Sequence, residues 1–566
     1  MNKLRKSLFR LLLILPMLGI AMVANGQSDP TGKSEATRTY AITNATIVQA
    51  PGKIMEEGTI VIKDGLITAI GKNVSIPSNA EVIDGTDMYL YPGFIDGMSN
   101  TAADRPEAME RPDNLFTPDP PNDYAGITPE HHVAGQIDVE ENSIDGMRKV
   151  GFAISHTVPY GRMLPGSGAL LLLRDVDHAD DMILSEDVSM FTQFSGAPGA
   201  YPGNTLGIMA KFRTLYRNAE YSKKHADMYA ENPAGISRPT RDRVSEAFYP
   251  VVTNQKPIFY DASSSLEARR AMRLQKELGF SLVLGNLQEG WDLADEIKAS
   301  GTKVFMSLDL PKEPKASKED DKSEEMAKLE ERRMEFYKKY VSQYSELKNA
   351  GVKFGFSTID TRGNQVKDNL MTIIENGLSE DDALAALTTN PADLLGISEM
   401  VGTLDQGKIG NVIVSTGPYF EKDSQLKYVF VDGDKHEYEI KDNKKKSGDT
   451  ENSESTSEGS SSIVGTWSYS FTTPQGEQTG SMIIKKDGDF YTGTLTSDDG
   501  TPDNDMVNIS FVNDALDFEF SVDAGGQSID VVVNGTVTGN EYEAEATVTA
   551  FNISFPLLAT KEAPEK

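Results

Sequence analysis

Cysteine is absent from the 566-residue chain. Its absence excludes disulfide bonds, thiolate nucleophiles and thiolate metal ligands, and it also excludes a lipid-modified N-terminal cysteine. Basic residues are scarce relative to acidic ones, with 55 Lys and Arg against 86 Asp and Glu. The resulting formal net charge of −31 opposes binding to nucleic acid and to anionic lipid, so we expect neither as a partner.

Beyond its N-terminus the sequence also lacks an apolar run long enough to cross a bilayer. At the N-terminus a basic start precedes an apolar run from Leu11 to Val23, and small residues follow at Ala24-Asn25-Gly26. This pattern predicts a secretory signal peptide over residues 1–26. The alternative is an uncleaved anchor, for which the run is short. With no lipid-attachment cysteine, the signal predicts a periplasmic or secreted protein that has no membrane span after cleavage.

The order of strand-like and helix-like patterns along the sequence predicts the order of its domains. Residues 38–92 consist of short alternating β runs, with a hairpin expected at Asp64-Gly65. Residues 93–398 alternate strand and helix patterns, which predicts an α/β fold, a (β/α)8 TIM-type barrel with a parallel sheet. Residues 399–435 return to β structure, and we expect them to complete a composite β-sandwich domain with residues 38–92.

The C-terminal part has a different composition. Residues 441–462 contain almost no apolar side chains and predict a disordered linker. Residues 463–560 predict an antiparallel all-β domain, a small barrel or sandwich, with turns at Gly525-Gly526 and Asn534-Gly535. Within the barrel region, residues 311–346 are rich in Lys and Glu and predict an inserted, solvated helix over the barrel mouth.

Five segments, in this order, carry a family resemblance: ITNATI with DGLITAIG, VIDGTDMYLYPGFID, MRKVGFAISHTV, LTTNPADLLGI, and VGTLDQGKIGNVIVS. With them, the region from residue 40 to residue 433 resembles the amidohydrolase superfamily, nearest its imidazolonepropionase-like and prolidase-like metal-dependent hydrolases. The resemblance implies a metal-binding barrel beside a composite β-sandwich. It also implies an activity, the hydrolysis of C–N bonds in dipeptide or non-peptide substrates.

The metal ligands that the resemblance implies are largely replaced. The family places His-x-His after barrel strand 1, one His each after strands 5 and 6, and Asp after strand 8. In this chain those places fall on Met98 and Asn100, on Asp261, on Gly285 or Asn286, and on Ile359, with Asp360 one residue late. A thioether and a neutral amide are poor ligands for such cations. We therefore expect no bound cofactor.

None of the six histidines falls on a ligand position: they are His131, His132, His156, His178, His225 and His436. His156 lies in a predicted strand and is expected to be a hydrogen-bonded core or pocket residue, which makes it a candidate ligand contact. The Gly/Pro-rich loop 196–207 adds Tyr201 and Asn204 as further candidates for ligand contact. Asp261 and Asp360 are the remaining catalytic candidates.

The prediction is an exported amidohydrolase-like pseudoenzyme that binds a small amide or peptide-like ligand, or that supports an active amidohydrolase relative. A second hypothesis is an active hydrolase in which Asp261, Asp360 and Asn100 hold a divalent metal (Zn, Mn or Mg) through oxygen ligands, or which works without metal. A third is a non-catalytic interaction protein that uses its C-terminal β domain. No serine-hydrolase elbow, P-loop, HExxH or dinucleotide fingerprint is present.

Overall fold

The structure is a computed structural model that describes residues 38–106, 111–112, 114–314, 324–440, 463–473, 476–487, 490–498, 504–512, 515–524, 527–548 and 553–562. It has two compact units, Met1–Asn443 and Lys444–Lys566. The predicted signal peptide, 1–26, and the predicted linker, 441–462, lie outside the described residues. Among the helices that are described, none combines the length and apolar character needed to span a bilayer.

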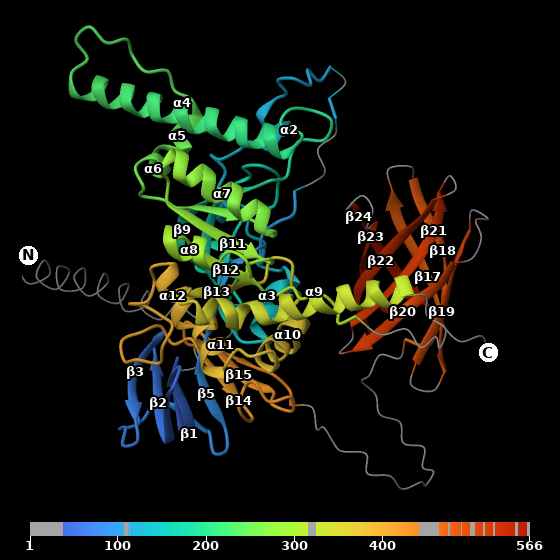
Figure 1. Ribbon diagram of the computed structural model, residues 1–566. Helices are drawn as coiled ribbons and strands as arrows, with labels where there is room; N and C mark the ends of the chain where they lie inside the picture. The colour runs from blue at the N-terminus through green and yellow to red at the C-terminus, as the bar shows by residue number, and fades with distance from the viewer. Residues whose placement is uncertain are drawn as a thin grey trace, which may run out of the picture. The chain divides into compact units, whose positions relative to one another are not determined.

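One sheet of the first unit joins strands from both ends of that unit. Its eight strands run in the order β16-β15-β14-β5-β1-β2-β3, with β4 paired to β1. The two ends meet where β5 and β14 pair antiparallel, with Leu90 opposite Val414. Figure 1 shows the blue N-terminal strands beside the orange β14 and β15. The strands are β1 (Thr39–Ala50), β2 (Lys53–Lys63), β3 (Leu66–Gly71), β4 (Glu81–Asp84), β5 (Tyr89–Pro92), β14 (Val412–Ser415), β15 (Leu426–Val431) and β16 (Asp434–Glu437).

The sheet forms its own apolar core from alternate residues of its strands. Ile42, Ile60, Leu90 and Phe430 are buried together there, as expected of strands that turn one face inward. The hairpin predicted at Asp64-Gly65 is confirmed, because Lys63 pairs with Leu66 across it. Both turn residues have positive φ, +49° and +79°, a conformation that suits Asp and Gly.

A second eight-stranded sheet forms a nearly closed barrel. The strand order is β13-β12-β11-β10-β9-β8-β7-β6. Most neighbours are parallel, including the run from β9 to β13. The strands are β6 (Phe94–Ser99), β7 (Phe152–Thr157), β8 (Gly166–Leu172), β9 (Ile183–Gln193), β10 (Ile258–Asp261), β11 (Leu282–Leu287), β12 (Lys303–Ser307) and β13 (Phe354–Ser357).

The prediction of an all-parallel (β/α)8 barrel is wrong at β8. This strand pairs antiparallel with both β7 and β9. Only residues 158–165 connect β7 to β8, and no described helix lies between them. A parallel connection needs a crossover of a dozen or more residues, whereas a short loop forces the chain back antiparallel. The apolar run ALLLL identified a buried strand but carried no signal of its direction.

Helices follow the later strands, and their ends are set by local sequence. In α7 the side chain of Ser264 accepts a hydrogen bond from the Glu267 backbone N–H, and Gly279 ends the helix at φ +86°. The helices are α2 (Asn122–Ala125), α3 (Asn142–Arg148), α4 (Thr205–Glu231), α5 (Arg243–Ala247), α6 (Tyr249–Val252), α7 (Ser265–Leu278), α8 (Ala294–Ser300), α9 (Glu324–Asn349), α10 (Gly363–Glu375), α11 (Glu380–Leu387) and α12 (Thr389–Leu394), with 3₁₀ turns η1 (Val133–Gln136) and η2 (Ala179–Asp181).

Asp96 joins β6 to β13, the first and last strands of the barrel sheet. Its buried carboxylate accepts hydrogen bonds from the backbone N–H groups of Met98 and Thr358, both at 3.2 Å, and from the Thr358 hydroxyl. The Ser357 hydroxyl donates to the Met98 carbonyl at 2.6 Å. Burial raises the pKa of Asp96 to about 7. The aspartate of the PGFID phrase thus closes the barrel seam.

His156 crosses the barrel interior from β7. Its Nδ1 lies 2.8 Å from the carbonyl oxygen of Gly97, and its Nε2 lies 2.8 Å from the Ser189 hydroxyl. A carbonyl only accepts, so Nδ1 carries the proton and Nε2 accepts from the serine. The side chain is completely buried, and burial lowers its pKa to about 4. His156 is therefore neutral in the folded protein.

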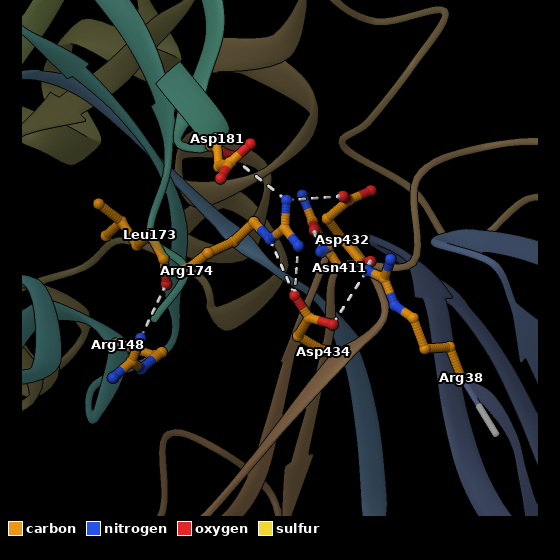
Figure 2. Close-up of polar contacts among 8 residues, drawn as sticks. All are labelled: Arg38, Arg148, Leu173, Arg174, Asp181, Asn411, Asp432 and Asp434. Carbon is orange, nitrogen blue, oxygen red and sulfur yellow. Dashed lines mark hydrogen bonds and ion pairs between the residues drawn. The ribbon is translucent and has the colours of Figure 1, made fainter. Parts of the chain in front are cut away.

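An ion-pair network links the barrel sheet to the composite sheet (Figure 2). Arg174, just after β8, donates to the Asp434 carboxylate at 2.6 and 2.9 Å and lies 3.4 Å from the Asp432 carboxylate. Arg38 pairs with Asp434 from the other side at 2.9 Å. The Asn411 side chain accepts from the Asp432 backbone N–H at 2.7 Å. These contacts fix the β15–β16 turn against the barrel.

The second unit is a closed antiparallel barrel of eight strands. Its core contains Trp467, whose indole N–H donates to the Ile463 carbonyl at 2.9 Å. The turn expected at Asn534-Gly535 is wrong, because β22 continues through both residues, and Gly535 pairs with Ala544. The strands are β17 (Gly465–Thr473), β18 (Gly476–Asp487), β19 (Phe490–Ser497), β20 (Asn504–Val512), β21 (Ala515–Ala524), β22 (Gln527–Thr538), β23 (Glu541–Val548) and β24 (Ile553–Lys561).

The burial of neutral His156 predicts a loss of stability in acid. An unfolded histidine takes up a proton below its ordinary pKa of 6.5, whereas the folded one resists until about 4. Lowering the pH between these values therefore favours unfolding, by about 1.4 kcal/mol per unit of pKa difference, or about 3 kcal/mol in all. Urea unfolding of wild type and of His156→Gln can be followed by Trp291 fluorescence in a Trp467→Phe background. The difference in unfolding free energy between the two proteins should decrease as the pH falls.

The control is His178→Gln, since His178 is exposed. Its stability should run parallel to that of wild type over the same pH range. A wild-type to His156→Gln difference that stays constant from about pH 7 to about pH 4.5 would contradict a neutral, buried His156.

Candidate functional site

The carboxyl ends of three barrel strands bring Asp261, Asn286 and Asp360 together. The Asn286 amide nitrogen donates to the Asp360 carboxylate at 2.6 Å and lies 3.4 Å from the Asp261 carboxylate. Asn286 is buried and has a φ of +53°, in the left-handed region that Asn tolerates better than most residues. Its Oδ1 atom is buried and has no hydrogen-bond partner among the described residues. The catalytic rim of barrel enzymes lies at this end of the strands.

The rim carries acids with raised pKa values. Burial, and then the charge of Asp360, raises the pKa of Asp261 to about 7, against the opposing hydrogen bond from Asn286. Burial and the same Asp360 charge raise the pKa of Asp309, which follows β12, to about 6. A carboxyl group that titrates near neutral pH can give up or accept a proton in a reaction. The rim therefore has acid–base capacity.

Below the rim the barrel interior is filled by large apolar side chains. Met98 is completely buried in a cluster with Phe259 and Phe305. A Cβ atom on Gly97 would lie 1.9 Å from the Phe305 ring, and one on Gly285 would lie 2.5 Å from the Met98 sulfur. The two glycines thus provide the space that the phenylalanine and the methionine occupy. Met98 acts as a core residue here.

The side chains at two other predicted metal-ligand positions also contact other parts of the protein. The Asn100 amide nitrogen donates to the Val158 carbonyl at 2.7 Å. Ile359 packs, half-buried, against the cluster that contains Met98. In the described residues there is no group of three or more His, Cys, Asp or Glu side chains that could hold a metal ion. The residues present do not fit the imidazole-bound metal centre that the family implies.

Two of the three candidates for ligand contact, His156 and Asn204, already have hydrogen-bond partners within the protein. Both nitrogens of His156 have partners inside the barrel. The Asn204 side chain caps α4 by accepting from the Gly207 backbone N–H at 2.9 Å. Tyr201 is half-buried, and its ring lies close to Gly207. No hydrogen bond found in the described part of the chain joins these three residues to Asp261 or Asp360.

Sequence reasoning missed Asp309 and the aromatic residues beside it. Asp309 follows the predicted strand KVFMSL directly, so its place at a strand end was a usable signal. Phe336 and Tyr340 lie four residues apart in the charged insertion, which puts them on one face of a helix. That face packs over the barrel: Tyr340, Val341, Tyr344 and Leu347 are buried. The prediction of a solvated helix therefore agrees with the exposed N-terminal half of α9 and is wrong for its C-terminal half, which is buried against the barrel.

Comparisons with known proteins identify the fold. Residues 287–435 match the sequence model of the Amidohydrolase family. The chain is similar to an amidohydrolase from Thermotoga maritima MSB8, with a TM-score of 0.58, 19% identity, and coverage of 70% of this chain and 99% of that one. Among curated proteins, no sequence matches this chain.

Two further solved structures match less closely, each at a TM-score of 0.43. One is a prolidase complexed with N-methylphosphonate-L-proline, at 15% identity over 71% of this chain and all of that one. The other is a Xaa-Pro dipeptidase with bound methionine in its active site, at 14% identity over the same shares. Residues 287–435 thus match the Amidohydrolase family, and the fold of the chain is similar to that of a solved amidohydrolase.

Proposed function

We propose that this protein is an exported amidohydrolase-superfamily member that binds a small amide or peptide-like ligand without the family's metal-assisted hydrolysis. The observation that carries the proposal is Met98. It stands where the family has a metal-binding histidine, and it is buried among phenylalanines, with Gly285 shaped to receive it. Metal-assisted hydrolysis needs an ion that activates water, and imidazole and carboxylate ligands to hold that ion. The basic and apolar pattern of residues 1–26 supports export.

The proposed ligand would meet the acidic rim rather than a metal. Asp261 and Asp360 supply two carboxylates, each within hydrogen-bonding distance of the Asn286 amide. Such groups recognise donors, which peptide and amide ligands have in their N–H groups and amines. If this barrel only binds the ligand, an active amidohydrolase relative encoded elsewhere would hydrolyse it.

A second candidate is a hydrolase with an oxygen-only metal site or with no metal. The observation that favours it is the pair of carboxylates on the Asn286 amide, together with the pKa of Asp261, which is about 7. Two carboxylates and an amide oxygen suit Mg²⁺ or Mn²⁺ better than Zn²⁺. The following measurement separates the two candidates.

Metal content and turnover test the proposal directly. The protein, purified with zinc, manganese or magnesium present and then desalted, should contain far less than one ion per chain by elemental analysis. The wild type should hydrolyse dipeptides and N-acyl amino acids no faster than Asp261→Ala does. The outcome that overturns the proposal is one bound ion per chain together with turnover that Asp261→Ala abolishes.

The core role of Met98 gives a second test. Met98→Leu keeps volume and apolar character and should cost less than about 1.5 kcal/mol of unfolding free energy. Met98→Ala should leave a cavity and cost about 2–5 kcal/mol. Met400→Ala, at a methionine with 39% of its surface exposed, should change stability by less than about 0.5 kcal/mol.

Chemical denaturation with and without added divalent ions provides the readout. A core methionine predicts that the ions stabilise neither the wild type nor Met98→Leu. If divalent ions stabilise the wild type and Met98→Leu removes that effect, Met98 is a ligand and the proposal fails.

A further inference from the structure

A small cavity lies at the edge of the barrel rim, separate from the Asp261–Asn286–Asp360 group. Its volume is about 250 Å³. Its walls come from the loops after three consecutive strands, with Ser263 after β10, Glu289 after β11 and Asp309 after β12, and from Phe336 and Tyr340 of α9. At this size the cavity accommodates a compact head group rather than a whole drug-sized ligand.

The walls are fixed to one another by hydrogen bonds. The Ser263 carbonyl accepts from the backbone N–H groups of Gln288 and Glu289, at 2.9 and 3.0 Å. Gln343 of α9 accepts from the Gly290 backbone N–H at 2.6 Å and donates to the Gln288 carbonyl at 2.7 Å. The loops and the helix are therefore held in place before any ligand arrives, which lowers the entropic cost of binding.

One side of the cavity is aromatic. Phe336 and Tyr340 lie with their ring centroids 6.1 Å apart, and Trp291 packs on both, at 5.6 and 6.1 Å. Phe336 keeps 45% of its surface exposed, although large apolar side chains are usually covered. The Tyr340 hydroxyl donates to the Asp309 carbonyl at 3.1 Å, which holds that ring beside the aspartate. The faces of such rings attract cations.

The opposite side of the cavity is acidic. Asp309 and Glu289 both line it, and no lysine or arginine is among the described residues that do so. Within the described chain, no basic side chain forms an ion pair with the Asp309 carboxylate. Asp360 lies near enough for its charge to raise the pKa of Asp309, to about 6 together with burial. Because two carboxyl groups and no described basic side chain line the cavity, an anionic ligand would be repelled.

We propose that this cavity is a binding site for a compact organic cation, a protonated amine or quaternary ammonium group carried by the ligand. The aromatic faces of Phe336 and Tyr340 flank the cation, and the Asp309 and Glu289 carboxylates neutralise it. The cation site rests on the proposed function, because it assigns a positive charge to one end of the ligand proposed there. A neutral amide alone would leave the two carboxylates without a counter-charge.

Calorimetric titration of the full-length mature protein with tetramethylammonium chloride tests the site. The matched neutral probe is 3,3-dimethylbutan-1-ol, and sodium chloride at equal concentration controls for ionic strength. We expect saturable binding of tetramethylammonium only. Phe336→Ala should weaken it about fivefold or more, and Asp309→Asn about tenfold.

Matched control variants separate the site from general effects. Leu329→Ala removes another exposed apolar side chain from α9, and Asp119→Asn removes an exposed carboxylate elsewhere. Both should bind tetramethylammonium like wild type. Because 45% of the Phe336 surface is exposed, Phe336→Ala should remain folded, and its unfolding midpoint checks this before the titration. As a second readout, Trp291 fluorescence in a Trp467→Phe background should change with tetramethylammonium.

Two results would overturn the cation site. One is the absence of saturable tetramethylammonium binding above the sodium control. The other is equal binding of the neutral probe, or equal weakening by Leu329→Ala and Phe336→Ala. Metal-dependent turnover would overturn the proposed function and leave the cation result intact, so the two failures are distinguishable.

Discussion

Close packing at the centre of the barrel determines what this protein can do chemically. Gly97 and Gly285 have no Cβ, and Phe305 and Met98 fill the space that they leave. Because protein interiors are packed at crystal-like density, a filled centre leaves no room for a hydrated ion at that depth. The carboxylates of Asp261 and Asp360 instead lie at the strand ends above it, where both contact the Asn286 amide.

The rim is unusual in its charge. Acidic side chains follow β10, β12 and β13, and the amide of Asn286 is the hydrogen-bond donor that bridges Asp261 and Asp360. Burial, and then the charge of Asp360, raises the pKa values of Asp261 and Asp309. A cationic ligand relieves this repulsion without a metal ion. Helix α9 adds the aromatic side chains of Phe336 and Tyr340 beside Asp309, so charge and shape in that cavity favour the same class of ligand.

The sequence predicted the barrel region and the similarity to amidohydrolases, because phrases such as PGFID and LTTNPADLLGI are local and keep their order. It did not predict the direction of β8, because an apolar run such as ALLLL reads the same in either direction. The position of Met98 was accessible from the phrase PGFID, and those of Asp261 and Asn286 from the predicted strands KPIFYDA and SLVLGN that end at or next to them. The cavity beside Asp309 was not, because Phe336 and Asp309 are brought together only by the docking of α9. That docking depends on Gln343, whose partners lie in a loop more than fifty residues away.

The pairing of β5 with β14 carries a consequence for how the chain matures. Ser415 bonds to the Tyr89 carbonyl across 326 residues of sequence. A ribosome makes the chain from its N-terminus, so the first strands emerge long before their partner exists. Until then β5 presents an open edge, which is the kind of surface that recruits other strands. In the nascent chain the free edge of β5 thus stays exposed until the whole barrel region has been synthesised. A chaperone that shields β5 would act during that time.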